Sequence, residues 1–179
     1  MGPEPFSINC LSAVAEPSFH IDLFTPETWQ EAGACDYTIT GFSERRLAYA
    51  MRVEEGDIFL CYLTGKSRFI GALRATSTVF SDSEPIWTSQ VFPARFHCEL
   101  IVKVPEDRGI HLRVVQAQSA KPDTYNWIFR ASPQQIPTED GWWILRRLQA
   151  IAAESQQERD LEIQLGADGP TTDPPPLSP

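Results

Sequence analysis

Two apolar segments that follow one another closely, residues 58–63 and 68–76, constrain the fold of this chain more than any other feature. Residues 58–63 are almost entirely apolar, which is typical of a strand buried on both faces of a sheet. The segments are joined by Thr64-Gly65-Lys66-Ser67, a sequence typical of a hairpin turn. Gly71, in the middle of the second segment, predicts a bulge or a close approach of another part of the backbone.

Two other segments have the alternation of a strand. Residues 19–24 place apolar side chains alternately with His20 and Asp22, which predicts a half-buried strand. Residues 96–104 alternate over a longer stretch and gather their apolar side chains on one face. Residues 110–118 are ambiguous between strand and helix.

Helices are predicted before, between and after these strands. The sequence Thr25-Pro26-Glu27 is a good helix start, with a hydroxyl cap, a proline at the first position and an acid in the first turn. A second helix is predicted from Ser43, and a third over residues 139–153, where apolar side chains form a broad stripe. A short β-meander flanked by helices predicts an α+β fold, with an antiparallel sheet that curls into a twisted β-barrel.

The length of 179 residues is enough for one ordinary domain. We expect a loose lead-in over residues 1–16 and the folded domain over residues 17–165. Residues 166–179 are rich in proline and acidic overall, and they predict a disordered tail that cannot bury a core.

The net charge of −9 is concentrated at the two ends of the chain. Residues 1–40 contain six acids and no Lys or Arg, and residues 154–179 contain six acids and one base. The intervening residues carry 14 bases and 12 acids, so that the middle of the chain is mildly basic. This distribution excludes strong non-specific binding to nucleic acid but leaves room for a local basic face.

The usual signatures of catalysis are missing from the sequence. It contains no phosphate-binding loop and no nucleophile elbow, and its three histidines are not at metal-ligand spacing. The four cysteines are widely separated, which favours reduced core residues and a cytoplasmic protein over a zinc site or disulfides. No apolar run is long enough to cross a membrane. We therefore expect a protein that is not an enzyme and that holds no metal or cofactor.

Trp87 is the most informative aromatic residue of the chain. It is flanked by Ser83, Glu84, Thr88 and Ser89, which are poor neighbours for a core residue. Packing in the core is the commoner fate of a tryptophan. An aromatic side chain in a polar loop is nevertheless a candidate for binding.

The order and spacing of four motifs resemble the EVE domain, a family of the PUA-like superfamily that is related to YTH domains. The motifs span roughly residues 18–148 and include the runs Leu23–Trp29, Val53–Gly65, Phe69–Ala72 and Val91–Arg95. The resemblance implies a small PUA-like β-barrel with flanking helices. It also implies recognition of a modified base, chiefly methylated cytosine or adenine, that is flipped into an aromatic pocket.

The resemblance also suggests which residues form the site. The ligand-binding residues that it implies are Trp87, Tyr37, Thr25, Asp36, Tyr62 and Phe24. The basic residues expected to hold the flanking phosphates are Arg45, Arg46, Lys66, Arg68 and Arg95. The implied partner is nucleic acid with a modified base, DNA in preference to RNA, within a restriction or defence system whose nuclease or other effector is another chain.

Three alternatives remain open at this point. The same fold could serve RNA recognition, and competition with RNA would separate the two. A regulator that binds a small molecule or nucleotide would bind nucleosides without binding oligonucleotides. An enzyme ranks last, because no nucleophile, acid–base pair or metal cluster emerges from the sequence.

Overall fold

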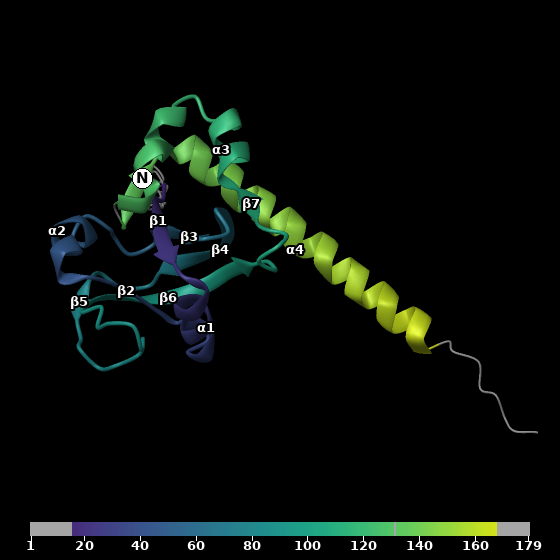
Figure 1. Cartoon of the computed structure of the whole chain (residues 1–179), viewed down its shortest axis with the longest axis horizontal. Helices are drawn as coiled ribbons and strands as arrows, with labels where there is room; N and C mark the ends of the chain where they lie inside the picture. Colours follow the sequence, from purple (N-terminus) through teal and green to yellow (C-terminus); the bar gives the residue numbers. More distant parts are fainter. Residues whose placement is uncertain (1–15, 131, 168–179) are drawn as a thin grey trace, which may run out of the picture.

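A curled sheet forms the centre of the molecule in the computed structural model, which describes residues 16–130 and 132–167 (Figure 1). Six of its eight strands lie in the order β2-β6-β4-β3-β1-β8, while β5 pairs with β6 and β7 pairs with β4. The strands are β1 (Phe19–Phe24), β2 (Ile39–Phe42), β3 (Ile58–Leu63), β4 (Arg68–Ala75), β5 (Phe80–Ser81), β6 (Ala94–Lys103), β7 (Ile110–His111) and β8 (Gln134–Ile136). The expected α+β fold is confirmed, with the sheet forming a half-barrel flanked by helices.

The hairpin of β3 and β4 occupies the middle of the sheet, as the sequence predicts. All six residues of β3 are buried. Gly71 pairs with Cys61, and the register of the two strands shifts between Cys61 and Tyr62. A Cβ atom on Gly71 would lie 3.0 Å from the Trp29 ring and 3.1 Å from the Val102 carbonyl oxygen. The predicted bulge and close approach are both present.

β1 departs from the expected antiparallel arrangement, because it runs parallel to β3 and antiparallel to β8. A long connection through α1 and β2 returns the chain from β1 to β3, as parallel neighbours require. The prediction that β1 is half-buried is also wrong. His20 and Asp22 are only 4% and 2% exposed, since β1 has a neighbour on each side. Helix α4 (Thr138–Ala167) packs on one face of β1 at Phe19, and the curl of the sheet brings Thr40 of β2 over Asp22 on the other face.

Helix α1 (Pro26–Ala34) begins where the sequence predicts and follows directly after the end of β1 (Figure 1). Thr25 and Thr28 form a capping box in which each side chain accepts a hydrogen bond from the backbone N–H of the other. The second predicted helix is shorter than expected. From Ser43 the chain forms a 3₁₀ turn, η1 (Glu44–Arg46), and then the single turn α2 (Leu47–Ala50).

The remaining helices cover one side of the sheet. The ambiguous residues 110–118 divide into β7 and α3 (Leu112–Gln118), and α3 is followed by the 3₁₀ segment η2 (Pro122–Arg130). The last helix, α4 (Thr138–Ala167), has 30 residues and is about twice as long as predicted. Its first half packs on the sheet through Ile144 and Leu148, which are fully buried.

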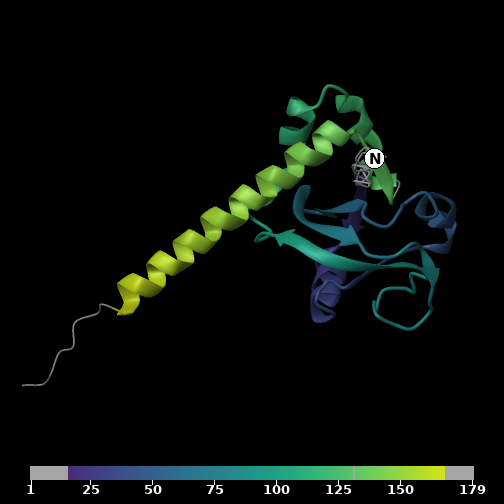
Figure 2. The same ribbon diagram turned by 180° about the vertical axis from the view of Figure 1, so that it is seen from behind.

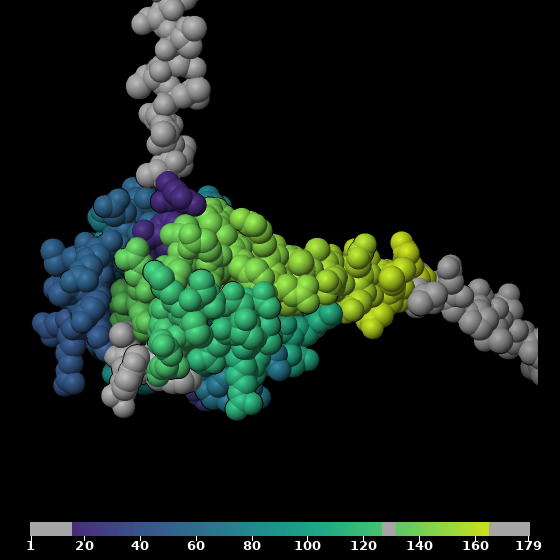
Figure 3. All heavy atoms as spheres, turned by 90° about the horizontal axis from the view of Figure 1, so that it is seen from above, coloured from purple at the N-terminus to yellow at the C-terminus, as the bar shows by residue number. Residues whose placement is uncertain are grey.

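The second half of α4 extends beyond the body of the molecule, as both ribbon views show (Figure 2). Viewed from above, α3, η2 and the first half of α4 together form one face (Figure 3). Residues 168–179 of the predicted tail and residues 1–15 of the predicted lead-in lie outside the described residues. Among the helices that the structure describes, none is long and apolar enough to span a membrane.

Candidate functional site

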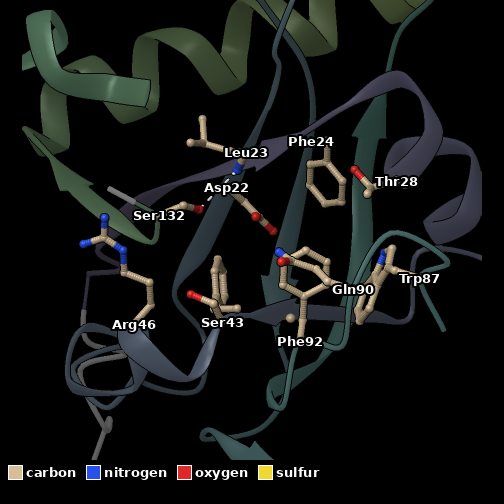
Figure 4. A pocket seen from close by; sticks show the side chains of 12 residues that line it. Asp22, Leu23, Phe24, Thr28, Ser43, Arg46, Trp87, Gln90, Phe92 and Ser132 are labelled. Carbon is tan, nitrogen blue, oxygen red and sulfur yellow. Dashed lines mark hydrogen bonds between the residues drawn. The ribbon is translucent and has the colours of Figure 1, made fainter. Parts of the chain in front are cut away.

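A cavity of about 380 Å³ opens at the end of β1, between β2 and the loop formed by residues 82–93 (Figure 4). Apolar and polar side chains share its lining, which consists of Asp22, Leu23, Phe24, Thr28, Gly41, Phe42, Ser43, Arg46, Trp87, Gln90, Phe92 and Ser132. Its volume lies within the range of small-molecule binding sites.

Aromatic rings supply the walls of this cavity. Phe24 comes from the end of β1 and Phe42 from the end of β2, while Trp87 and Phe92 come from the 82–93 loop. The Trp87 ring stands edge-on to Phe92, with 5.2 Å between ring centroids and an interplanar angle of 89°. Trp87 is only 5% exposed, so the loop turns its largest side chain inward.

The 82–93 loop is fixed near its middle and at its base by polar contacts. Near its middle, the Thr88 backbone N–H and hydroxyl donate to Glu31 Oε1 of α1, at 3.0 and 2.6 Å. At its base, the Arg95 guanidinium forms a 2.5 Å ion pair with Asp82 and also donates to the Glu84 and Phe92 carbonyl oxygens. These contacts position Trp87 as a preformed wall.

A glycine allows the Trp87 ring to lie directly on β2. A Cβ atom on Gly41 would be 3.0 Å from two Trp87 ring carbons and 3.0 Å from Phe92 Cβ. Such contacts are tighter than those that side chains normally make, and any larger residue would push the aromatic wall outward.

Asp22 is the acidic group of the cavity, and its carboxyl group points into it (Figure 4). The Thr40 hydroxyl donates to Asp22 Oδ2 at 2.5 Å. Burial raises the pKa of Asp22 to about 7, and hydrogen bonds from Thr40, the Leu23 N–H and the Ser132 hydroxyl oppose the rise. Near neutral pH, both the acid and the carboxylate are therefore accessible.

The charged side of the cavity lies on η1. Arg46 lines the cavity, and its guanidinium carbon lies 5.4 Å from the centre of the Tyr49 ring. Arg52 lies over the same ring at 5.3 Å, and Tyr49 is 44% exposed. A basic and aromatic surface, formed by Arg45, Arg46, Tyr49 and Arg52, thus begins at the rim of the cavity.

Three of the residues predicted from the sequence meet at this cavity. Trp87 and Phe24 form part of its aromatic wall, and Arg46 lies on its rim. Arg45 is the neighbour of Arg46 in η1 and is exposed to solvent.

Tyr37 and Asp36 lie elsewhere, beyond the end of α1. The Tyr37 ring packs on Trp29 with 4.5 Å between centroids, and Lys103 Nζ lies 4.9 Å from its centre. These three residues line a separate hollow of about 320 Å³. Asp36 is exposed at a turn with a φ of 52°. Tyr37 and Trp87 therefore do not face one cavity.

The other predicted residues also do not line the cavity. Thr25 caps α1, Tyr62 is fully buried against Phe69, and Lys66 lies in the β3–β4 turn. Arg68 donates to the Gly109 carbonyl oxygen at 2.5 Å.

The prediction that Arg95 contacts a phosphate is wrong, because its side chain is buried. The Arg95 side chain is 0% exposed, and it is occupied by Asp82 and by the carbonyl groups of the loop. It also lies 5.6 Å from the Trp87 ring. Arg95 positions the wall of the cavity and does not reach solvent.

Sequence reasoning missed Asp22, Phe42, Gln90 and Phe92 as site residues. Asp22 gave the clearest signal, because aspartate is depleted in strands and here stands in the middle of one. The alternation of β1 predicted that Asp22 would face solvent. Only the curl of the sheet, which brings Thr40 of β2 over β1, places Asp22 inside.

Larger hollows occur along α4, with volumes of about 650 and 570 Å³. Exposed charged residues such as Glu54, Arg74 and Arg146 contribute to their lining around Trp142. Over residues 16–130 and 132–167, no three His, Cys, Asp or Glu side chains are grouped so as to hold a metal ion. The cavity at Asp22 combines aromatic walls with a buried polar group and is the best candidate site.

Comparison with solved structures identifies the fold. No family model matches the sequence, and no curated protein matches it. The Pho92 YTH domain, solved in complex with m6A, is 14% identical with a TM-score of 0.58, over 74% of this chain and 84% of that one. The YTH domain of Toxoplasma CPSF4, solved in apo form, is 14% identical with a TM-score of 0.58, over 83% of this chain and 96% of that one.

A third solved structure is the YTH domain of the MRB1 protein of Zygosaccharomyces rouxii, in complex with N6-methyladenosine RNA. It is 18% identical with a TM-score of 0.51, over 72% of this chain and 85% of that one. At such identities the likeness extends to the fold. We conclude that this chain has the fold of the YTH domains.

Proposed function

We propose that this chain is a non-catalytic reader that binds one methylated base of a nucleic acid strand in the cavity at the end of β1. The observation that carries the proposal is the combination of four aromatic side chains with a buried acid, Asp22, in a cavity of about 380 Å³. Flat apolar walls suit the faces of a base, and the acid suits its polar edge.

RNA is the partner that we propose first. The sequence favoured DNA in a defence system, but two of the similar structures, the YTH domains of Pho92 and MRB1, were solved with m6A and with N6-methyladenosine RNA. The ribose hydroxyl is the group that allows a protein to distinguish RNA from DNA. DNA as the target and a partner effector chain are therefore secondary proposals. The binding assay described below compares RNA probes with DNA probes directly.

Stacking supplies most of the affinity in this proposal. Extruding a base costs a few kcal/mol, and stacking it on an aromatic side chain returns about 1–3 kcal/mol. Burying one methyl group adds about 0.8 kcal/mol, or roughly fourfold in affinity. Larger discrimination requires that the unmethylated base leave part of the cavity unfilled or a polar group unpaired.

The strand on either side of the bound base has a path along η1 and α2. Arg45 and Arg46 stand next to the cavity, and exposed Tyr49 offers a ring for a neighbouring base. Because the chain carries a net charge of −9, we expect only a few phosphate contacts and weak non-specific binding.

Fluorescence polarisation with matched oligonucleotides tests the proposal. The probes are short single-stranded RNAs with one central N6-methyladenosine or 5-methylcytosine, their unmethylated twins, and the DNA versions of all four. We expect at least one methylated probe to bind several-fold more tightly than its twin, and Trp87→Ala to weaken it roughly 10- to 100-fold.

Trp143→Ala is the matched control, because Trp143 lies on α4 outside the cavity and should leave binding unchanged. Trp87→Phe keeps an aromatic wall and should bind with intermediate affinity, which separates loss of stacking from loss of folding. Equal binding of methylated and unmethylated probes by the wild-type protein would remove the proposal. So would a folded Trp87→Ala protein that still discriminates.

A further inference from the structure

Asp22 differs from an ordinary surface acid in what surrounds it. Its side chain is buried in the middle of β1, yet its carboxyl group points into the cavity (Figure 4). Its polar neighbours are uncharged groups, chiefly the hydroxyls of Thr40 and Ser132. Four aromatic side chains, Phe24, Phe42, Trp87 and Phe92, line the same cavity.

This environment favours the protonated acid over the carboxylate. Burial raises the pKa of Asp22, because the charged form loses its hydration. A base that enters the cavity displaces water from the carboxyl group and raises the pKa further. The charge of Arg46 on the rim acts in the opposite direction.

The two forms of the acid make different hydrogen bonds to the edge of a base. A carboxylic acid has one O–H donor next to one C=O acceptor, whereas a carboxylate has acceptors only. Adenine and cytosine present a ring nitrogen acceptor beside an exocyclic N–H donor, and a methyl group on the amine leaves one N–H. The acid can therefore make two parallel hydrogen bonds to this edge, and the carboxylate can make only one.

We propose that Asp22 recognises the bound base as a carboxylic acid, donating to a ring nitrogen and accepting from the exocyclic amine, so that base binding takes up a proton. This inference rests on the proposed function and assigns a recognition role to a residue of the same cavity. The proton comes from solvent, and no covalent bond to the base is made or broken.

Other groups near Asp22 do not titrate in the relevant range. Cys61 of β3 pairs with Asp22, and burial raises the pKa of its thiol well above the ordinary value. Burial raises the pKa of Cys98 on β6 to about 12. The pKa of His20, two residues away on β1, is lowered by burial despite its contact with Asp57, so that its imidazole is neutral above pH 7.

The test measures the affinity for the N6-methyladenosine and 5-methylcytosine RNA probes from about pH 6 to about pH 9, at constant ionic strength. For the wild-type protein, we expect the dissociation constant to be nearly constant at the acidic end. Above about pH 7.5 it should rise roughly tenfold per pH unit, as the uptake of one proton requires.

Two variants make the test specific to Asp22. Asp22→Asn presents the same donor and acceptor without titrating, so it should bind as the wild-type protein does at about pH 6 and show no pH dependence. Asp22→Leu is similar in size but cannot pair with the base, and it should bind roughly ten- to a hundredfold more weakly at every pH.

An affinity that stays flat or rises with pH in the wild-type protein would overturn the inference and leave the reader function intact. An Asp22→Asn protein that keeps the wild-type pH dependence would also overturn it. Failure of the wild-type protein to prefer either methylated probe at any pH would remove both the inference and the proposed function.

Discussion

Asp22 lies in β1 and Asp57 directly precedes β3. Both carboxyl groups are buried, but their surroundings differ. Asp57 accepts hydrogen bonds from the Ser18 and Glu54 backbone N–H groups, at 2.8 and 2.9 Å, and lies 3.2 Å from His20 Nε2. Asp22 accepts from the Thr40 hydroxyl and points into a cavity. The groups around Asp57 come from two segments, Ser18 and His20 at the start of β1 and Glu54 before β3, and they tie the start of β1 to the start of β3.

The difference separates a structural acid from one that is available to a ligand. A carboxylate that already accepts from several donors stabilises the fold and has little capacity left for a partner. A buried carboxyl group at a cavity with hydroxyl neighbours costs stability when it ionises, and a ligand can remove that cost. The following predictions test this contrast, from the largest expected effect to the smallest.

Asp57→Ala should reduce the free energy of unfolding by about 3–5 kcal/mol, because it leaves two backbone N–H groups and His20 without their acceptor. Asp22→Asn should change it by less than about 1 kcal/mol at pH 6, where the wild-type group is already largely protonated. Urea denaturation of both variants measures the difference. Equal losses in the two variants would contradict the contrast.

The stability contributed by Asp22 should fall as the pH rises from about 4 to about 7. The pKa of Asp22 is raised to about 7, so the folded state holds a proton that the unfolded state has released, and folding weakens across this window. We expect a loss of roughly 2–4 kcal/mol in total.

His20 has the opposite sign, since its lowered pKa makes the folded state more stable as the pH rises through about 6.5. The comparison of wild-type protein with Asp22→Asn isolates Asp22, because both retain His20. Urea midpoints at several pH values should fall with pH more steeply in the wild-type protein. Parallel curves would show that Asp22 titrates normally.

Thr40→Val removes the hydroxyl donor that stabilises the charged form of Asp22. We expect the pKa of Asp22 to rise further and the protein to lose about 1 kcal/mol above pH 7, with a smaller loss at pH 5. Urea denaturation at the two pH values checks this. A larger loss at the acidic pH would mean that the hydroxyl serves the neutral acid instead.

Gly41→Ala should have the smallest effect. Its Cβ atom would meet the Trp87 ring and Phe92 at 3.0 Å and displace the aromatic wall by a few tenths of an ångström. We expect affinity for the methylated probe to fall by roughly two- to fivefold, with a stability change below about 1 kcal/mol. Tighter binding would show that the wall is not positioned as the structure has it.

The sequence predicts the parts of this molecule that depend on local pattern. The β3–β4 hairpin, the cap at Thr25 and the tight approach at Gly71 follow from residue type and spacing. The predicted α4 is too short, because the last turns of the helix, where Leu161 and Ile163 are exposed, lie beyond the body and have no apolar stripe to mark them.

The candidate site depends on contacts between distant segments, which periodicity does not encode. The curl of the sheet brings Thr40 over Asp22, and Arg95 turns inward to hold the loop that carries Trp87. Trp87 could be singled out because its neighbours in sequence are polar. Tyr37 could not be placed, because its packing against Trp29 depends on how the chain turns after α1.

The central claim, that a base methyl group enters the aromatic cavity, is tested most directly by NMR of a probe with a ¹³C-labelled methyl group. In an RNA with labelled N6-methyladenosine, or with labelled 5-methylcytosine, the methyl resonance should move upfield on binding, because it lies against aromatic rings. The shift should be lost with Trp87→Ala. A methyl resonance that stays in place while the oligonucleotide binds would contradict the account.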